Sequence, residues 1–546
     1  MAKKRAQKPG GPKSQGGRGR TSRQGGKRTE AEPKSGSGAA ARTPQRPPSD
    51  GGSPWGRGVS ETSSPVALQR SDLDVGGRVP LDIESMTGEG QGIARVDGYI
   101  VFVAGAIPGE RVEAEILSLA SSYGKARTVD VLAPSDDRVD PGCHHFGECG
   151  GCVWQHIDYS GQLAWKEELL RSVLAHKLPR VRLPIRPMMG VTDPWGTRHK
   201  IHYSIVEYGR GKSRRFGLGH HLANSDKLLA VSECPVHHPA GEELARKAFL
   251  WLRERDVPVS APHRKGAGLK SLLVRTAGKS GLSHLVLVAT GDPVKGLDAS
   301  FVESVLKLPN VTGVHLNVQP DATSSYVGET TRLLGGDARL IEEVGGVEFH
   351  VSPDVFFQTN ARAAQQMLDV VLRFAGDPPS APPANQSGKP SRRGRSAVGA
   401  NSVLDLYSGV GLFSLPLAKA GFNVTAVEEN PRSVADGIES VKKNGIRNCR
   451  FVASRAQQYL KKLQRDARFD TVILDPPRDG CPEWAIRILG RGLRPRRIIN
   501  VSCNPHALAN DLTMLTQSGY RIREIQPIDM FPHTAHIESV TLLERE

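Results

Sequence analysis

The sequence lacks the features that mark membrane and secreted proteins. In its 546 residues no run of about 18 apolar side chains occurs, which argues against a membrane-spanning helix. Its first residues contain no apolar stretch of the kind that a secretory signal needs. It has only seven cysteines, unevenly spaced, which do not make a disulfide scaffold. We therefore expect a soluble intracellular protein that makes no contact with a membrane.

Large apolar and acidic side chains are scarce over residues 1–70, which hold 15 Lys and Arg against 4 Asp and Glu. Such a segment buries too little apolar surface to offset its ordering entropy, so we predict a disordered basic tail. The tail's composition fits a nucleic-acid arm, a nuclear address or an organelle transit segment, which leaves the compartment open. Residues 376–401 are similarly reduced to Pro, Ser, Gly and Arg, and they predict a flexible insertion.

Residues 71–134 contain short runs of alternating apolar and polar residues, separated by turns that carry Gly or Pro. This pattern predicts a small closed β-barrel, with a Gly-rich turn at residues 88–92 between its first strands. The segment resembles the TRAM module, an OB-like barrel found on RNA-modifying enzymes. Barrels of this type commonly bind single-stranded nucleic acid, and an ordinary barrel without a ligand is the alternative.

From Ser402 onward, predicted strands alternate with predicted helices, which indicates a parallel sheet covered on both faces. The strand Val403–Leu406 runs into a turn with glycines at positions 409 and 411, where the backbone can approach a cofactor closely. The next strand ends at Glu428. An acid at the tip of the second strand accepts hydrogen bonds from ribose hydroxyls.

A further predicted strand, Phe469–Leu474, runs directly into Asp475-Pro476-Pro477-Arg478. This pattern is typical of S-adenosylmethionine-dependent methyltransferases that act on nucleic-acid bases. A dinucleotide dehydrogenase is the competing interpretation. It would need a third glycine where Ser414 stands, and it would not explain the D-P-P-R motif.

The predicted strand Ile498–Ser502 leads into Cys503. A lone cysteine after a strand is usually a small buried hydrophobe, but at the carboxyl edge of a parallel sheet beside a cofactor it is a candidate nucleophile. Carbon-5 of uracil reacts poorly with a sulfonium methyl group. A thiolate that adds at carbon-6 creates an enolate whose carbon-5 can attack, and a base must then remove the carbon-5 proton. The chemistry requires one cysteine and one carboxylate on the same ring.

Five motifs together resemble the RNA uracil-5 methyltransferase family: F-F-Q-T-N, D-L-Y-S-G-V-G, D-P-P-R, S-C-N-P and D-M-F-P-H-T-x-H-I-E-S. The similarity runs from about residue 72 to Glu546. It implies that Cys503 is the nucleophile and that Glu538 takes the carbon-5 proton. It also implies that S-adenosylmethionine is bound by Gln358, Tyr407, Glu428 and Asp475. The chain departs from the family at Leu412, where a polar residue is common, and at residues 452–455, so no adenine contact is assigned there.

Four of the seven cysteines, Cys143, Cys149, Cys152 and Cys234, form a group of potential metal ligands. Four thiolates hold either Zn²⁺ or an iron–sulfur cluster, and structural zinc sites usually have two C-x2-C pairs rather than one pair with isolated partners. In the resembled family this arrangement binds a [4Fe–4S] cluster, which we therefore favour over zinc. We expect it to be a structural clip between the barrel linker and the middle domain. Cys449 and Cys481 are assigned to core packing.

These observations predict a multidomain fold with four parts. They are the tail (1–70), a TRAM OB-like barrel (71–134), an iron–sulfur and α+β middle domain (135–350) and a Rossmann-like class I methyltransferase domain (351–546) with its insertion. In the middle domain Arg198 and Lys200 are candidates for neutralising RNA phosphates.

The predicted partner is RNA, and we expect the protein to be a monomer. Barrel and cluster together favour ribosomal over transfer RNA, because bacterial tRNA enzymes of the resembled family typically lack both, although other tRNA members have them. A non-catalytic RNA-binding assembly factor would have lost Cys503 or Glu538. A cytosine-5 methyltransferase would carry a cysteine in the D-P-P loop, where Arg478 stands.

Overall fold

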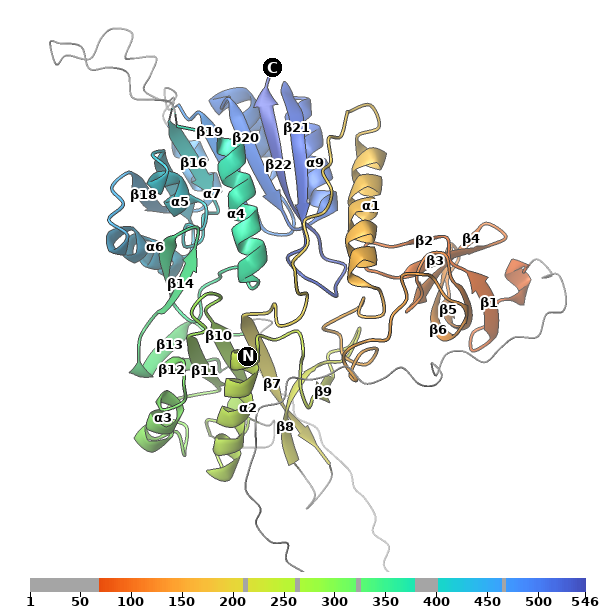
Figure 1. The fold of residues 1–546 in the computed structure, drawn as a ribbon, viewed down its shortest axis with the longest axis horizontal. Coiled ribbons are helices and arrows are strands. Elements are labelled where there is room, and N and C mark those ends of the chain that lie inside the picture. Colours follow the sequence, from red (N-terminus) through yellow and green to blue (C-terminus); the bar gives the residue numbers. More distant parts are fainter. Residues whose placement is uncertain (1–67, 210–214, 261–265, 321–325, 379–400, 464–467) are drawn as a thin grey trace, which may run out of the picture. The chain divides into compact units, whose positions relative to one another are not determined.

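The computed structural model describes residues 68–209, 215–260, 266–320, 326–378, 401–463 and 468–546 (Figure 1). Nearly all of the predicted tail and of the predicted insertion lies outside the described residues. No helix of the described residues is long and apolar enough to cross a membrane. The domain boundaries given above stay a prediction.

The first module is a six-stranded sheet in the order β1-β5-β6-β4-β3-β2. Its strands are β1 (Arg78–Asp82), β2 (Ser85–Met86), β3 (Gly92–Val96), β4 (Tyr99–Ala104), β5 (Arg111–Leu119) and β6 (Tyr123–Ala133). The two strands at the ends of this order, β1 and β2, are consecutive in the chain. The residues between them bond to both sides: the Ile83 N–H donates to the Glu110 carbonyl and the Glu84 N–H to the Ile93 carbonyl. The sheet therefore closes, as the alternating pattern predicted.

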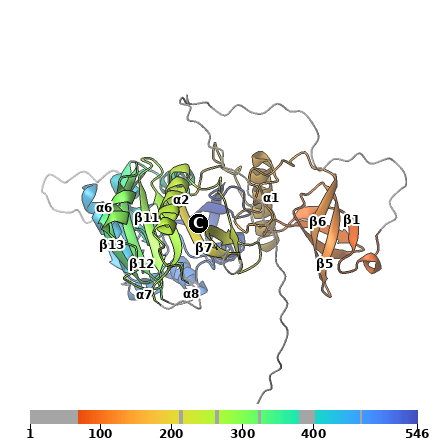
Figure 2. The same ribbon diagram turned by 90° about the horizontal axis from the view of Figure 1, so that it is seen from below.

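The second sheet has seven strands in the order β13-β12-β11-β10-β7-β8-β9. They are β7 (Lys200–Tyr208), β8 (Arg215–His221), β9 (Leu228–Ala230), β10 (Leu269–Thr276), β11 (Ser283–Ala289), β12 (Val311–Val318) and β13 (Thr330–Gly336). Helices α2 (Pro239–Glu254) and α3 (Ala299–Leu306) bury their apolar sides in one cluster with alternate residues of these strands, so both cover the same face. Helix α2 lies beside β7 and β11 in both views (Figures 1 and 2).

The third sheet has the order β18-β17-β16-β19-β20-β22-β21. Its strands are β16 (Ser402–Leu406), β17 (Asn423–Glu428), β18 (Cys449–Ala453), β19 (Thr471–Leu474), β20 (Arg497–Ser502), β21 (Tyr520–Ile528) and β22 (Glu538–Arg545). The first five in this order are parallel, as predicted, whereas β22 runs antiparallel between β20 and β21. The helices between and before its strands are α4 (Ala361–Ala375), α5 (Ser414–Lys419), α6 (Pro431–Lys443), α7 (Ala456–Lys462), α8 (Glu483–Arg487), the π-helix Ile488–Leu493 and α9 (Pro505–Thr516).

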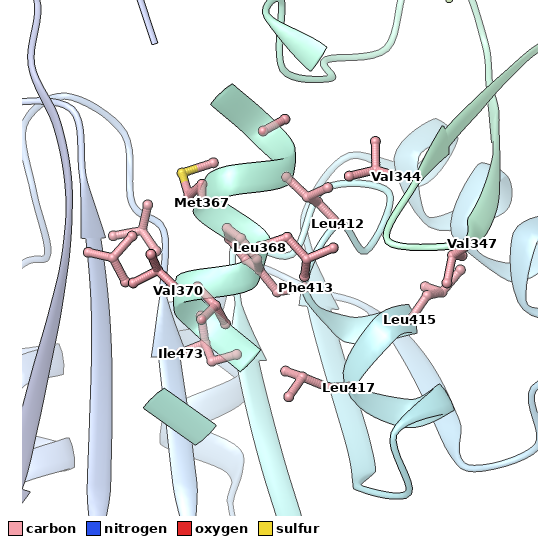
Figure 3. Close-up of a cluster of buried hydrophobic side chains, with 14 of the residues drawn as sticks. Val344, Val347, Met367, Leu368, Val370, Leu412, Phe413, Leu415, Leu417 and Ile473 are labelled. Carbon is pink, nitrogen blue, oxygen red and sulfur yellow. The ribbon is translucent and has the colours of Figure 1, made fainter. Parts of the chain in front are cut away.

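Apolar clusters cover both faces of this third sheet. One cluster joins α4, α5 and the hairpin of β14 (Leu340–Val344) and β15 (Val347–Val351), and Figure 3 shows Leu368 of α4 near Phe413. The other joins α7, α8 and α9 with Leu170 and Leu174 of α1 (Tyr159–Lys177). Leu412, the departure noted in the sequence, is buried in the first cluster. The apolar side chain therefore has a packing role there.

Candidate active site

A glycine turn connects β16 to α5 at the carboxyl edge of the third sheet. Tyr407, Gly409 and Gly411 have positive φ angles of 65°, 55° and 93°. A Cβ atom at Gly411 would lie 2.4 Å from a side-chain carbon of Leu415, so this position requires glycine. The backbone N–H groups of Tyr407 and Ser408 both donate to the Val427 carbonyl, which holds the turn against β17.

Two acidic side chains flank this turn, and their surroundings differ. The Glu428 carboxylate accepts hydrogen bonds from the Gly409 N–H (3.0 Å) and the Asn430 N–H (2.8 Å), so both of its oxygens are oriented. Asp405 is completely buried beneath the turn and accepts a hydrogen bond from the Ser414 hydroxyl at 2.5 Å. Burial, with a smaller contribution from the charge of Glu428, raises the pKa of Asp405 to about 7 against the opposing effect of the Ser414 hydrogen bond. Asp405 thus supports the turn, whereas Glu428 faces the cavity.

One cavity of 1110 Å³ is lined by all six residues to which the family resemblance assigned a catalytic or cofactor role. They are Gln358, Tyr407, Glu428, Asp475, Cys503 and Glu538. They come from the loop before α4 and from the carboxyl ends of β16, β17, β19 and β20, together with the first residue of β22. Phe356, which is 62% exposed, lies at the same cavity.

The reversed strand β22 brings Glu538 beside Cys503. Ser502 of β20 pairs with Ser539 of β22, so the next pair in this antiparallel register is Cys503 and Glu538. Burial raises the pKa of Cys503 to about 11, and the Glu538 charge contributes in the same direction. Burial likewise raises the pKa of Glu538 to about 8, with a further contribution from Asp475. Thiol and carboxyl therefore share one desolvated pocket.

Arg478 is the cation that opposes these shifts. Its charge lowers the pKa of both Cys503 and Glu538. Its guanidinium lies 3.0 Å from Nδ1 of His536, and its carbonyl accepts a hydrogen bond from the Asn504 side chain. From the sequence, Arg478 only distinguished this chain from cytosine-5 methyltransferases, which carry a cysteine in the D-P-P loop. The structure adds an electrostatic contact with the candidate nucleophile.

Comparisons with known proteins identify the family of this chain. Residues 396–546 match the family model described as tRNA (Uracil-5-)-methyltransferase, and residues 73–129 match the TRAM domain. An uncharacterized RNA methyltransferase of Caldanaerobacter subterraneus is 33% identical over 475 residues, which cover 87% of this chain and 99% of that relative. Another, from Halalkalibacterium halodurans, is 30% identical and covers 88% of this chain and 99% of that relative. This chain belongs to the RNA uracil-5 methyltransferase family.

The protein is therefore a SAM-dependent RNA methyltransferase with an amino-terminal TRAM domain. A solved structure supports the fold. The tRNA (uracil-54, C5)-methyltransferase of Pyrococcus abyssi, in complex with S-adenosyl-L-homocysteine, has a TM-score of 0.65 and 24% identity, and the match covers 85% of this chain and 100% of that one. The predicted TRAM domain and class I methyltransferase domain are thus confirmed.

The methyltransferase has a second cavity, of 460 Å³, that is lined by the four predicted ligand cysteines Cys143, Cys149, Cys152 and Cys234. Burial raises the pKa of Cys152, and raises that of Cys234 to about 12, with contributions from neighbouring cysteines. Arg198 has the opposite effect on both thiols. A set of four partly buried thiols next to a cation fits a site for a metal centre with several thiolate ligands.

The structure places Arg198 and Lys200 beside the predicted ligand cysteines. Both line the cysteine cavity, and the Arg198 guanidinium donates to the Gly151 carbonyl at 3.1 Å. Burial, together with the charge of Arg275, lowers the pKa of Lys200 to about 7. The phosphate-binding role of the two residues stays a prediction. Cys449 and Cys481 pack with the apolar clusters, as assigned.

Sequence reasoning missed the residues of α1 that hold the loop before Glu538. Lys166 and Asp529 form a fully buried ion pair at 2.6 Å, and the Tyr159 hydroxyl donates to the same carboxylate at 2.9 Å. Gln162 accepts a hydrogen bond from the His533 N–H at 2.8 Å. The three helix residues are spaced i, i+3 and i+7, which places them on one helix face. This spacing could have revealed the three residues in the sequence. However, polar residues along one face of a helix normally indicate that the face is exposed to solvent.

Proposed function

We propose that this methyltransferase transfers a methyl group from S-adenosylmethionine to carbon-5 of a uridine in structured RNA through a covalent bond to Cys503. The observation that carries the proposal is the register of β20 and β22, in which Cys503 and Glu538 are neighbours at the cavity that Glu428 and Asp475 also line. The nucleophile, the base and the candidate cofactor residues thus share one space.

The proposed reaction begins at carbon-6 of uracil. The Cys503 thiolate adds to carbon-6 of uracil, and the electron pair of the carbon-5–carbon-6 double bond is delocalised toward oxygen-4 as an enolate. Carbon-5 then attacks the sulfonium methyl group, and S-adenosylhomocysteine leaves. The Glu538 carboxylate accepts the carbon-5 proton, the carbon-6–sulfur bond breaks, and the thiolate is regenerated. Glu538 finally loses its proton to solvent.

We assign cofactor binding to Gln358, Tyr407, Glu428 and Asp475. Glu428 supports this role best, because two backbone N–H groups orient its oxygens at the tip of β17, where ribose hydroxyls are bound in this fold class. Asp475 follows β19, and burial, with added contributions from the charges of Asp405 and Glu428, raises its pKa to about 7. Its position at the start of D-P-P-R suits a group that contacts cofactor and base together.

We propose ribosomal RNA as the substrate, because the chain combines a TRAM barrel with four grouped cysteines. Transfer RNA is the second candidate, since the Pyrococcus abyssi protein is named for uracil-54 of tRNA. Mapping 5-methyluridine in both RNA classes of cells that lack the protein tests the proposal. We expect one ribosomal position to lose the modification and to regain it with the native gene but not with Cys503→Ala. Loss confined to tRNA would transfer the assignment, and no loss in either RNA would contradict it.

For the four cysteines we propose a [4Fe–4S] cluster, which the thiolates of Cys143, Cys149, Cys152 and Cys234 would hold. Protein purified without oxygen should be brown and contain about four iron atoms per chain. Zinc has one observation in its favour: the ligand atoms of His220, Cys234 and His237 lie within 4.8 Å of one another. Metal analysis that finds one zinc and no iron would establish zinc instead, and His220→Ala, which leaves all four cysteines in place, should then lower the zinc content but not an iron content.

A further inference from the structure

The cysteine cavity and the loop that ends at Glu538 are joined by backbone hydrogen bonds. Val153 and Trp154 directly follow Cys152, and the N–H groups of both donate to the His533 carbonyl at 3.0 Å. Cys152 lines the cysteine cavity, whereas Glu538 lines the active-site cavity. A single peptide segment therefore separates the last cysteine of the C-x2-C pair from the catalytic loop, residues 529–537.

His533 is the point at which this loop is held. Its φ of 63° lies in the left-handed region, a conformation that is strained for a residue with a side chain and persists only when neighbours enforce it. Gln162 supplies two of these contacts: its carbonyl accepts the His533 N–H, and its amide nitrogen lies 3.2 Å from Nδ1. The imidazole also stacks on Trp195, with ring centroids 4.1 Å apart. The strained backbone thus depends on partners outside the loop.

The start of the loop is anchored by the same helix. Lys166 forms an ion pair with Asp529, and both side chains are fully buried. The Lys166 ammonium group also donates to the Phe531 carbonyl at 3.0 Å. Gln162 in turn donates to the carbonyls of Trp154 and Ile157, so it holds the peptide after Cys152 and the loop at once. Helix α1 therefore connects the two segments as well as packing on the sheet.

We infer that occupation of the four-cysteine site positions Glu538, through the 152–154 segment, Gln162 and His533. The inference rests on the proposed function and deepens it. A metal centre bound at Cys152 restrains the peptide that follows, and this peptide carries the two N–H groups that hold His533 in its strained conformation. Without that restraint the loop gains conformational freedom, and the carboxylate is less often in the geometry for proton removal. Gln162 is a positioning residue in this scheme.

The first experiment measures hydrogen exchange of the loop in the full-length protein. Cys143→Ser removes a ligand that lies outside the 152–154 segment, so its effect must reach the loop through the shared site. We expect amides of residues 529–537 to exchange about fivefold faster or more when metal content is lost. The loss of one net hydrogen bond changes the equilibrium between closed and open loop by about that factor. Unchanged exchange in a variant that has lost its metal overturns the inference.

The second experiment separates the two chemical stages in a single turnover with labelled S-adenosylmethionine. Gln162→Leu keeps the side-chain volume but removes the hydrogen bonds that join His533 to the carbonyls of Trp154 and Ile157 through Gln162. We expect methyl transfer within about twofold of native, and release of RNA from the protein slowed about tenfold, which corresponds to about 1.4 kcal/mol. Leu170→Ala is the matched control. Leu170 is buried on the same helix but packs against α9, so the ratio of the rates of methyl transfer and RNA release should stay native.

The outcomes distinguish the two proposals. If Glu538→Gln fails to accumulate methylated RNA bound to protein, the proposed function is wrong. If Glu538→Gln accumulates it, whereas Gln162→Leu and Cys143→Ser release RNA at the native rate, the proposed function stands and the coupling is wrong. Should Gln162→Leu fail to fold, the exchange measurement on Cys143→Ser decides the question.

Discussion

Cys503→Ala is expected to lower methyl transfer by a factor on the order of 10⁴ or more, as the loss of a catalytic nucleophile does in other enzymes. Without the thiolate, carbon-5 of uracil has no route to the enolate. S-adenosylmethionine binding should stay near native, because Gln358, Tyr407, Glu428 and Asp475 are unchanged. The measurements are transfer of a labelled methyl group to RNA and equilibrium binding of the cofactor.

A covalent-adduct assay makes this test specific. In RNA that contains 5-fluorouridine, carbon-5 carries fluorine instead of a removable proton, so the native enzyme should remain attached to its substrate under denaturing conditions. Cys503→Ala should form no such adduct. Cys449→Ala is the control, because Cys449 is a partly buried cysteine that packs against the apolar core on β18. An adduct with Cys503→Ala would show that another residue is the nucleophile.

Glu538→Gln is expected to separate methyl transfer from turnover. The substitution keeps the shape of the side chain but removes the base, and the base is needed only after carbon-5 has received the methyl group. We therefore expect one labelled methyl group per active site, followed by accumulation of protein joined to methylated RNA. Turnover should fall by a factor on the order of 10²–10⁴, the usual contribution of general base catalysis.

The pH dependence tests the same role. Because the pKa of Glu538 is raised to about 8, the carboxylate is a minority form at neutral pH and its fraction grows as the pH rises through 8. Release of RNA by the native enzyme should therefore accelerate about tenfold per unit between pH 6 and 7.5. In Glu538→Gln this dependence should disappear. Glu544→Gln, at the far end of β22, removes a carboxylate that pairs with Arg523 and should retain it. Normal turnover by Glu538→Gln would exclude the assignment.

Local patterns sufficed to predict the barrel and the nucleotide-binding half of the sheet. In β1 and β5 the alternation of apolar and polar residues matches the alternation of buried and exposed side chains. The Asp97-Gly98 pair forms the turn between β3 and β4 with positive φ at both residues, as a tight hairpin requires. At β16 and β17, glycines and acids at strand ends predicted the turn and its neighbours, because these features depend on residues close together in sequence.

Only the tertiary structure showed which strands reverse direction and which residues far apart in the sequence become neighbours. The order of strands did not reveal that β22 inserts between β20 and β21, and only this register makes Glu538 a neighbour of Cys503. The sequence made Arg198 a candidate phosphate contact, and only the fold showed that it lines the cysteine cavity.

By itself, then, the sequence determined the kind of chemistry, since a cysteine, a carboxylate and a D-P-P-R motif at strand ends are legible as residue types. Only the tertiary structure decided how those groups are held. Lys166 and Asp529 are separated by 363 residues in the chain and yet are 2.6 Å apart. A buried ion pair of this kind leaves no local pattern, because each charge looks solvent-exposed until the fold supplies its partner.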